Sequence, residues 1–284
     1  MAGKTLNDGV KKSTTRRIFL VRNSEAAGFG GLRNNNAFQN HNKFAKMDID
    51  QAVMTVIRPD NLENSIEDPP LTQIGRSSAE LIGRSLSDRS FHIHTIYSSP
   101  SLRCIQVAFI TAIALMSTLN YRKLPRFRIE PALFEPFSLC HKIPKFLSPR
   151  DLQINGYAFD EHYKSVMSIT DLINAFHQEL RPSDIQKRVE KIVHRILSGR
   201  KQEGGILIIS HAPILDVIYR ILTNRHDMPR TMGDVQRLIH NYPRCSITVL
   251  QYNPMTDFWE NQQNAISQPT DWLSSSRVNV PNFD

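Results

Sequence analysis

Residues 205–213 read Gly-Ile-Leu-Ile-Ile-Ser-His-Ala-Pro, an apolar run followed by a short polar junction and a proline. Apolar residues without alternation are typical of a strand covered on both faces, as in the middle of a parallel sheet. Proline is favoured in the first turn of a helix, so we expect a helix from His211 to about Leu222. A strand that passes directly into a helix is the repeating unit of α/β proteins.

Further strands and helices alternate along the chain. Four β-like runs occupy residues 17–22, 95–99, 126–130 and 246–252. Helices are expected from Thr72 to about Ser87, from Ser99-Pro100 to about Asn120, and over residues 184–197 with Ser183 as the cap. This alternation predicts an α/β fold with three layers (αβα) around a mostly parallel central sheet.

The composition limits the class of protein. With 284 residues and 40% hydrophobic content, the chain can bury one sizeable core or a core with a modest subdomain. We find no stretch near the roughly 20 apolar residues of a membrane span, and residues 1–17 lack the apolar core of a signal peptide. Cys104, Cys140 and Cys245 lie far apart without metal-ligand spacing, so we expect no metal site and a reducing, cytoplasmic location.

The chain divides into a central domain and two polar ends. We expect a disordered basic leader at residues 1–15, one domain at 16–252 and a polar C-terminal tail at 253–284, in which Phe258, Trp259 and Trp272 could dock. The Asn-rich segment 28–70 is weakly periodic, and we interpret it as an insertion able to lie over the carboxyl edge of the sheet.

The net charge of +8 and the pI near 9.5 suit anionic partners such as phosphate esters, nucleic acid or acidic lipid surfaces. The helix expected at 184–197 has a basic face that includes Lys187, Arg188 and Lys191, opposite an apolar stripe. The stripe consists of Ile185, Val189, Ile192, Val193 and Ile196. The basic face is a solvated surface or, alternatively, a nucleic-acid contact, but no RNA-recognition signature or aromatic stacking series supports the latter.

Three side chains fall at strand–helix junctions, where parallel α/β sheets bind ligands. Arg22 ends the first strand, Arg103 lies in the first turn of the helix that follows Ser99-Pro100, and His211 ends the central strand. Two guanidinium groups, an imidazole and helix N-termini at one place would bind a phosphoryl group strongly. The spacing therefore predicts a phosphate pocket.

These residues belong to a longer ordered series of motifs. The series is Arg22-x-x-Glu25, Pro70-Leu71-Thr72-x-x-Gly75, Ser98-Ser99-Pro100-x-x-Arg103 and Ser210-His211-Ala212-Pro213, with further matching segments at 58–60, 67–71, 96–104, 128–135 and 206–216. It resembles the histidine phosphatase superfamily, also called the phosphoglycerate mutase-like family. Within that superfamily it is most similar to the phosphatase domain of the suppressor-of-T-cell-receptor-signalling (ubiquitin-associated and SH3 domain-containing) proteins, over about residues 16–252.

The resemblance implies a role for each pocket residue. Arg22 matches the arginine that binds phosphate, and Asn23 matches the histidine that attacks phosphorus. Arg103 and His211 match the second arginine and histidine, which stabilise the transferring group. Glu135 matches the acid that protonates the leaving oxygen, with Glu130 as a second candidate. The resemblance also implies that the chemistry needs no metal or other cofactor, and that a homodimer can form.

Asn23 departs from the family pattern at the residue that does the chemistry. An amide nitrogen has no lone pair of useful basicity, so a covalent step through Asn23 is not expected. Ser24 also replaces a glycine, and Ala26 replaces an arginine of the most similar relatives. The sequence therefore predicts a pseudophosphatase that binds a phosphate ester or phosphoprotein, or acts as a scaffold. The alternatives are a phosphomonoesterase with an atypical mechanism, in which Ser24 or a water activated by His211 attacks, and a basic nucleic-acid binder.

Overall fold

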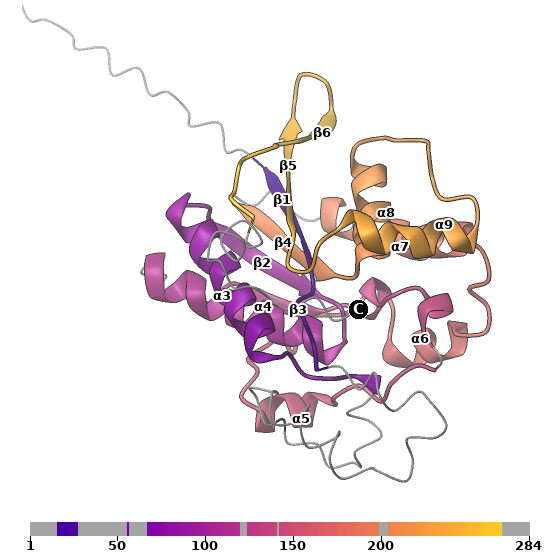
Figure 1. Cartoon of the computed structure of the whole chain (residues 1–284), viewed down its shortest axis with the longest axis horizontal. Helices are drawn as coiled ribbons and strands as arrows, with labels where there is room; N and C mark the ends of the chain where they lie inside the picture. The colour runs from indigo at the N-terminus through magenta and orange to yellow at the C-terminus, as the bar shows by residue number, and fades with distance from the viewer. Residues whose placement is uncertain are drawn as a thin grey trace, which may run out of the picture.

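The computed structural model describes residues 16–27, 56, 67–119, 124–140, 142–198 and 204–268. Within these segments a six-stranded sheet has the strand order β3-β2-β4-β1-β5-β6, with helices on both faces (Figure 1). The pairs β3/β2, β2/β4 and β4/β1 are parallel, whereas β1/β5 and β5/β6 are antiparallel. The predicted three-layer fold with a mostly parallel sheet is confirmed.

Five of the strands lie where the sequence places them, to within two residues. The strands are β1 (Arg17–Arg22), β2 (Ile93–Ser98), β3 (Arg126–Ile129), β4 (Gly205–Ser210), β5 (Ile247–Asn253) and β6 (Phe258–Asn261). The sequence did not predict β6, which falls in the segment expected to be a polar tail and pairs Trp259 with Tyr252. Only Trp259 of this strand is buried, so it has no alternation of apolar and polar residues that could be recognised.

The sheet is buried on both faces because the side chains of β1 and β4 alternate between two apolar layers. Phe19 and Val21 pack on the face covered by α3 (Gln73–Asp88) and α4 (Leu102–Leu119). Ile18 and Leu20 pack on the opposite face with α7 (Pro182–Ser198) and α8 (Ala212–Leu222), as Figure 1 shows. Both layers need apolar partners, which explains the uninterrupted apolar run of β4.

Two of the four helix starts agree with prediction. The Thr72 hydroxyl accepts from Gly75 N (3.1 Å) at the start of α3, and α8 follows His211 directly. The predicted start of α4 at Ser99-Pro100 is wrong, because the first helical acceptor is the carbonyl of Ser101, which Ile105 N contacts at 3.0 Å.

The predicted cap of α7 is also wrong. Pro182 opens this helix, which places Ser183 inside the first turn. The carboxylate of Asp184 accepts from the backbone N–H of Arg181 at 3.1 Å, so it satisfies the donor just before the helix.

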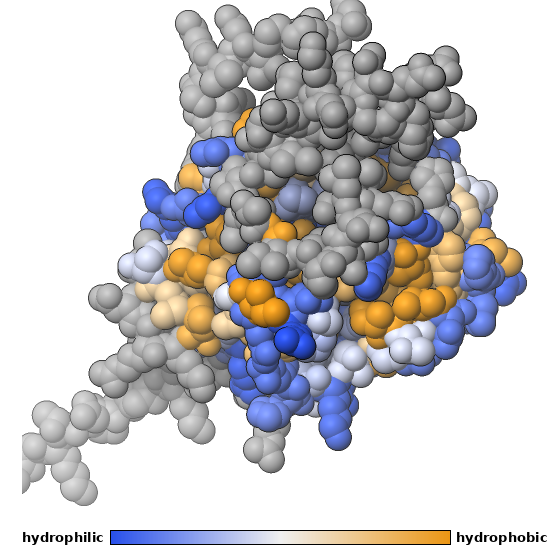
Figure 2. All heavy atoms as spheres, turned by 90° about the horizontal axis from the view of Figure 1, so that it is seen from below, coloured by the Kyte–Doolittle hydropathy of each residue, from blue (hydrophilic) through white to orange (hydrophobic). Residues whose placement is uncertain are grey.

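Shorter elements surround the carboxyl ends of the parallel strands. They are the helices α5 (Pro149–Ile154), α6 (Ile169–Ala175) and α9 (Met232–Arg237) and the 3₁₀ turns η3 (Pro131–Leu133), η4 (Phe137–Leu139) and η5 (Leu238–Asn241). Ile154 on α5 and Ile173 on α6 are exposed. Viewed from below, apolar residues gather in patches among hydrophilic ones (Figure 2).

Parts of the expected organisation lie outside the described residues. These are the basic leader at 1–15, most of the Asn-rich segment 28–70, and residues 269–284 with Trp272. None of the helices within the described ranges combines the length and the apolar character needed to cross a membrane.

Candidate active site

The register of β1 and β4 sets two candidate residues side by side. Arg22 pairs with Ser210 at the ends of these parallel strands, so the next residues, Asn23 and His211, leave the sheet together. A backbone bond from Asn23 N to Ser210 O (2.9 Å) fixes their spacing. Arg103 from the first turn of α4 and Glu135 from the segment after η3 reach the same place. The structure therefore brings together four of the five predicted site residues.

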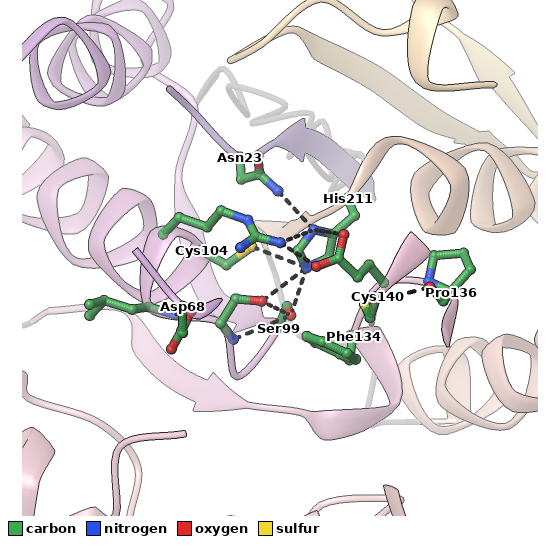
Figure 3. Close-up of polar contacts among 12 residues, drawn as sticks. Asn23, Asp68, Ser99, Cys104, Phe134, Pro136, Cys140 and His211 are labelled. Carbon is green, nitrogen blue, oxygen red and sulfur yellow. Dashed lines mark hydrogen bonds and ion pairs between the residues drawn. The ribbon is translucent and has the colours of Figure 1, made fainter. Parts of the chain in front are cut away.

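His211 is almost fully buried, and its contacts define its protonation state. The Asn23 amide nitrogen lies 3.0 Å from Nδ1, and Nη2 of Arg103 lies 3.3 Å from the same atom (Figure 3). Both groups only donate, so Nδ1 accepts and the ring proton sits on Nε2. Burial lowers the pKa of His211 to about 3, opposed by the Glu135 carboxylate and reinforced by Arg103 and Arg22. His211 is therefore neutral at physiological pH.

The opposite ring nitrogen faces two serines. Nε2 of His211 lies 3.1 Å from the Ser99 hydroxyl and 3.0 Å from the Ser101 hydroxyl. A serine nucleophile needs a histidine nitrogen that accepts its proton. Because Nε2 carries the proton in this tautomer, it donates to these serines and does not activate them. Neither serine was predicted as a site residue, because their stretch was interpreted as a helix start and as one motif of the family resemblance.

Arg103 and Glu135 form an ion pair within the pocket, with side chains 15% and 20% exposed. Burial alone would lower the pKa of Arg103, but the carboxylate of Glu135 raises it above its usual range. For Glu135, burial acts to raise the pKa, but the positive charge of Arg103 and the hydrogen bond from it outweigh burial and lower the pKa. Glu135 thus neutralises the charge of Arg103. An anion that binds Arg103 has to displace the carboxylate of Glu135.

The guanidinium of Arg22 turns toward a neighbouring loop. Nη1 donates to the carbonyl of Ile239 (3.0 Å) and to that of Tyr242. Burial lowers the pKa of Arg22, and the charges of Arg244 and Arg103 lower it further. Arg22 therefore contributes to the positive field of the pocket, while its recorded hydrogen bonds hold the loop after α9.

Besides Cys140, whose side chain hydrogen-bonds to Glu135, two more cysteines pack against residues of the candidate site, and neither was predicted as a site residue. The thiol of Cys104 is buried and lies 3.8 Å from Nε2 of His211, and burial raises its pKa to about 12. Cys245 is also buried, contacts the hydroxyl of Ser24 and donates its backbone N–H to the carbonyl of Asn23 at 3.2 Å. Both thiols are un-ionised at neutral pH and serve as packing around Asn23 and Ser24.

Comparison with known proteins agrees with the fold. A family model described as the histidine phosphatase superfamily (branch 1) matches residues 58–128. The ecdysteroid-phosphate phosphatase of Drosophila melanogaster is 26% identical over 238 residues, which cover 83% of this chain and 30% of that protein. The ubiquitin-associated and SH3 domain-containing protein A of Homo sapiens is 25% identical over 220 residues, covering 77% and 32%. The chain thus spans about a third of the length of these relatives.

A solved structure extends the likeness over almost the whole chain. The crystal structure of the ecdysone phosphate phosphatase of Bombyx mori, in complex with tungstate, superposes with a TM-score of 0.65 at 21% identity, covering 95% of this chain and 98% of that one. The chain therefore shares the fold of this phosphatase, and its sequence is similar to the histidine phosphatase superfamily.

Two motifs shared with the superfamily meet beside Asn23. The Thr72 hydroxyl donates to a carboxylate oxygen of Glu25 (2.9 Å), and Thr72 N donates to the Glu25 carbonyl (3.1 Å). Ala27 N donates to the carbonyl of Pro70 at 2.8 Å. A Cβ on Gly75 would lie far inside van der Waals contact with the Glu25 carbonyl, so only glycine allows α3 to approach this closely. These contacts anchor the loop that carries Asn23.

Arg188 holds the other side of the candidate site. Nε and Nη2 donate to the carboxylate of Glu179 at 2.6 and 3.0 Å, and Nη1 donates to the carbonyls of Ala132 (2.9 Å) and Phe134 (2.8 Å). The pair is buried, with side chains 4% and 5% exposed. Placing Arg188 on a solvated basic face was therefore wrong, because it borders the apolar stripe of α7 and turns inward to fix the backbone before Glu135.

Glu130 was the second candidate for the residue that protonates the leaving oxygen. In this structure its carboxylate instead links neighbouring segments by hydrogen bonds. It is buried and accepts hydrogen bonds from Ala132 N, the Tyr163 hydroxyl, Val166 N and Met167 N. Burial raises the pKa of Glu130, and these four bonds oppose the rise. Glu130 joins η3 to the segment before α6, and Glu135 is the carboxylate that contacts Arg103.

Proposed function

We propose that the chain is a pseudophosphatase, which holds a phosphate ester or a phosphoprotein in a histidine phosphatase pocket without hydrolysing it. The observation that carries the proposal is the contact from the Asn23 amide to Nδ1 of His211 at 3.0 Å. At the position that the family resemblance assigns to the nucleophile, this amide is a donor with no usable lone pair.

The surrounding groups support the same conclusion. His211 is a weak base because burial lowers its pKa to about 3, far below the pH at which a general base works best. Ser24 packs against the thiol of Cys245, and no base among the described residues is recorded in contact with its hydroxyl. Glu135 is ionised and paired with Arg103, so it holds no proton for a leaving group. Neither form of the atypical phosphomonoesterase is favoured by this geometry.

Anion binding needs only donors, and these are present. When an oxyanion displaces Glu135, Arg103 supplies a charge-assisted hydrogen bond and the Asn23 amide a second donor. Binding and barrier lowering are separate terms, so loss of a nucleophile need not abolish ground-state affinity. Two of the similar proteins are named as ecdysteroid-phosphate and ecdysone phosphate phosphatases, so we include steroid phosphates among the candidate ligands. A homodimer and a cytoplasmic location remain predictions.

The test is a calorimetric titration with vanadate and inorganic phosphate, run beside a turnover assay with p-nitrophenyl phosphate. We expect saturable binding and no hydrolysis above background in the wild type. Arg103→Ala should abolish binding, whereas Arg84→Ala, which removes an exposed arginine paired with Glu80, should not. Rapid hydrolysis that disappears in Arg103→Ala would overturn the proposal.

The nucleic-acid alternative is weakened by the position of Arg188. Of the three basic residues on which it rested, Lys187 and Lys191 are exposed, but Arg188 is buried against Glu179. Two exposed lysines on one helix are an ordinary solvated surface.

A further inference from the structure

Arg244 lies on a short loop that the pocket residues themselves hold. Cys245, the residue after it, donates its backbone N–H to the carbonyl of Asn23 at 3.2 Å, and the carbonyl of Ser246 accepts from Arg22 N at 3.0 Å. Arg22 also binds the carbonyl of Tyr242 on the other side of Arg244. The backbone of Arg244 is therefore fixed relative to the pocket.

The side chain of Arg244 is only loosely engaged. It is 58% exposed, and its recorded partner is the carboxylate of Glu25 at 3.8 Å. The other carboxylate oxygen of Glu25 already accepts from the Thr72 hydroxyl at 2.9 Å. An exposed ion pair at this distance contributes little to stability, so the guanidinium can exchange Glu25 for an external anion at small cost.

Arg244 extends the positive field of the pocket outward. After burial, its charge is the largest influence lowering the pKa of Arg22, ahead of that of Arg103. Of these three arginines, Arg103 is engaged by Glu135 and Arg22 by two carbonyls. Arg244 is the exposed member, and it stands beside the loop that carries Asn23.

We propose that Arg244 is a specificity-determining residue that binds a second anionic group of the ligand, while Arg103 binds the phosphoryl group. The ligand class is then a phosphate ester with a further acidic group near the phosphate. This inference rests on the proposed function of the pocket as an anion binder. In this proposal Arg244 selects phosphate esters that carry a second negative charge. Asn23, Arg103 and His211 contact only the phosphoryl group and do not make this selection.

The test compares phenyl phosphate with 4-carboxyphenyl phosphate by calorimetry on the full chain. Wild type should bind the carboxylated ester more tightly. Arg244→Gln should weaken binding of that ester by about fivefold and leave phenyl phosphate within about twofold. Arg244→Lys keeps the charge and should keep most of the preference. Arg84→Gln is a matched control, since Arg84 is 57% exposed and also has one carboxylate partner, and it should change neither affinity.

The outcomes separate the inference from the proposed function. If Arg244→Gln leaves both affinities unchanged, or lowers both equally, Arg244 does not read a second acidic group and the inference fails while the pocket stands. If wild type binds neither ester, the proposed function fails and the inference falls with it.

Discussion

Asn23 and His211 directly follow two adjacent parallel strands, and the amide nitrogen of Asn23 lies 3.0 Å from Nδ1 of His211. The nitrogen of the Asn23 amide only donates hydrogen bonds, so Nδ1 of His211 has to accept. Asn23 thus helps to fix the tautomer of the imidazole. Asn23, together with Arg103, therefore sets which ring nitrogen of His211 carries the proton, and in the proposed function it is also the residue that leaves the site without a nucleophile.

Replacing Asn23 by histidine should create turnover. We expect Asn23→His to raise hydrolysis of p-nitrophenyl phosphate at least about tenfold above the wild-type background, a small part of the roughly 10⁴–10⁶-fold that enzymes lose with a nucleophile. Adding Ser24→Gly and Ala26→Arg should raise it further. The same changes in an Arg103→Ala background are the control and should be inactive. A variant that binds phosphate as wild type does, but hydrolyses nothing, would contradict this expectation.

Removing the charge of Glu135 should strengthen anion binding. Glu135→Gln frees Arg103, and we expect sulfate affinity to rise about fivefold to tenfold. Because Arg103 lowers the pKa of Glu135, wild-type affinity should increase only as the pH falls toward and below the usual carboxyl range, while the variant should show no such increase. Glu80→Gln removes an equal charge from an exposed pair and is the control. Calorimetry from pH 7 down to about 3.5, below the usual carboxyl pKa, measures both effects, and weaker binding by Glu135→Gln would refute them.

Burial of neutral His211 should make the fold sensitive to acid. The folded pKa is about 3 and the ordinary value is 6.5, so between these limits the unfolded chain binds a proton that the folded chain does not. Stability then falls as the pH falls, by up to about 1.4 kcal/mol per pH unit from this residue. We expect urea unfolding of His211→Gln to show a shallower loss of stability than wild type from pH 6.5 to 5. Equal slopes would show that His211 does not contribute.

The buried pair of Arg188 and Glu179 should be essential for stability. Arg188→Ala leaves the buried Glu179 carboxylate without its charged partner and removes the donor to two carbonyls, and we expect a loss of about 3–5 kcal/mol in the free energy of unfolding. Lys187→Ala, the adjacent exposed residue on α7, should change it by less than about 0.5 kcal/mol. Similar urea midpoints for the two variants would disprove the structural role of Arg188.

The approach of α3 to the Asn23 loop should depend on Gly75. A methyl group there collides with the Glu25 carbonyl, so Gly75→Ala should destabilise the fold by about 1–3 kcal/mol and weaken phosphate binding. In α9, a Cβ on Gly233 meets nothing nearer than 3.7 Å, so Gly233→Ala should stabilise by about 0.5–1 kcal/mol. Thermal unfolding compares the two, and a Gly75→Ala protein as stable as wild type would contradict the close approach.

The position of the candidate site could be predicted from the sequence, because its residues lie at strand ends and helix starts that short sequence patterns reveal. Strand ends and helix starts predict where Asn23, Arg103 and His211 leave the sheet, and parallel strands bring such positions to one edge. The direction in which a long side chain points cannot be predicted from its neighbours in the sequence. Arg22 turns to carbonyls more than 200 residues away, and Arg188 turns inward because Glu179 and η3 satisfy its donors. Contacts between residues so distant in sequence leave no periodic signal.

The frame of the pocket consists of main-chain bonds. Asn23 N donates to Ser210 O at 2.9 Å, and Ser99 N donates to Ile209 O at 3.0 Å, so β1, β2 and β4 are joined at their carboxyl ends without the help of any side chain. Such a frame keeps its dimensions when the residue at position 23 changes. If the proposed function holds, we expect a single substitution at position 23 to change whether the site turns its ligand over, with the frame unchanged. Position 23 is thus a natural point at which to engineer a substrate-trapping reagent or to restore turnover.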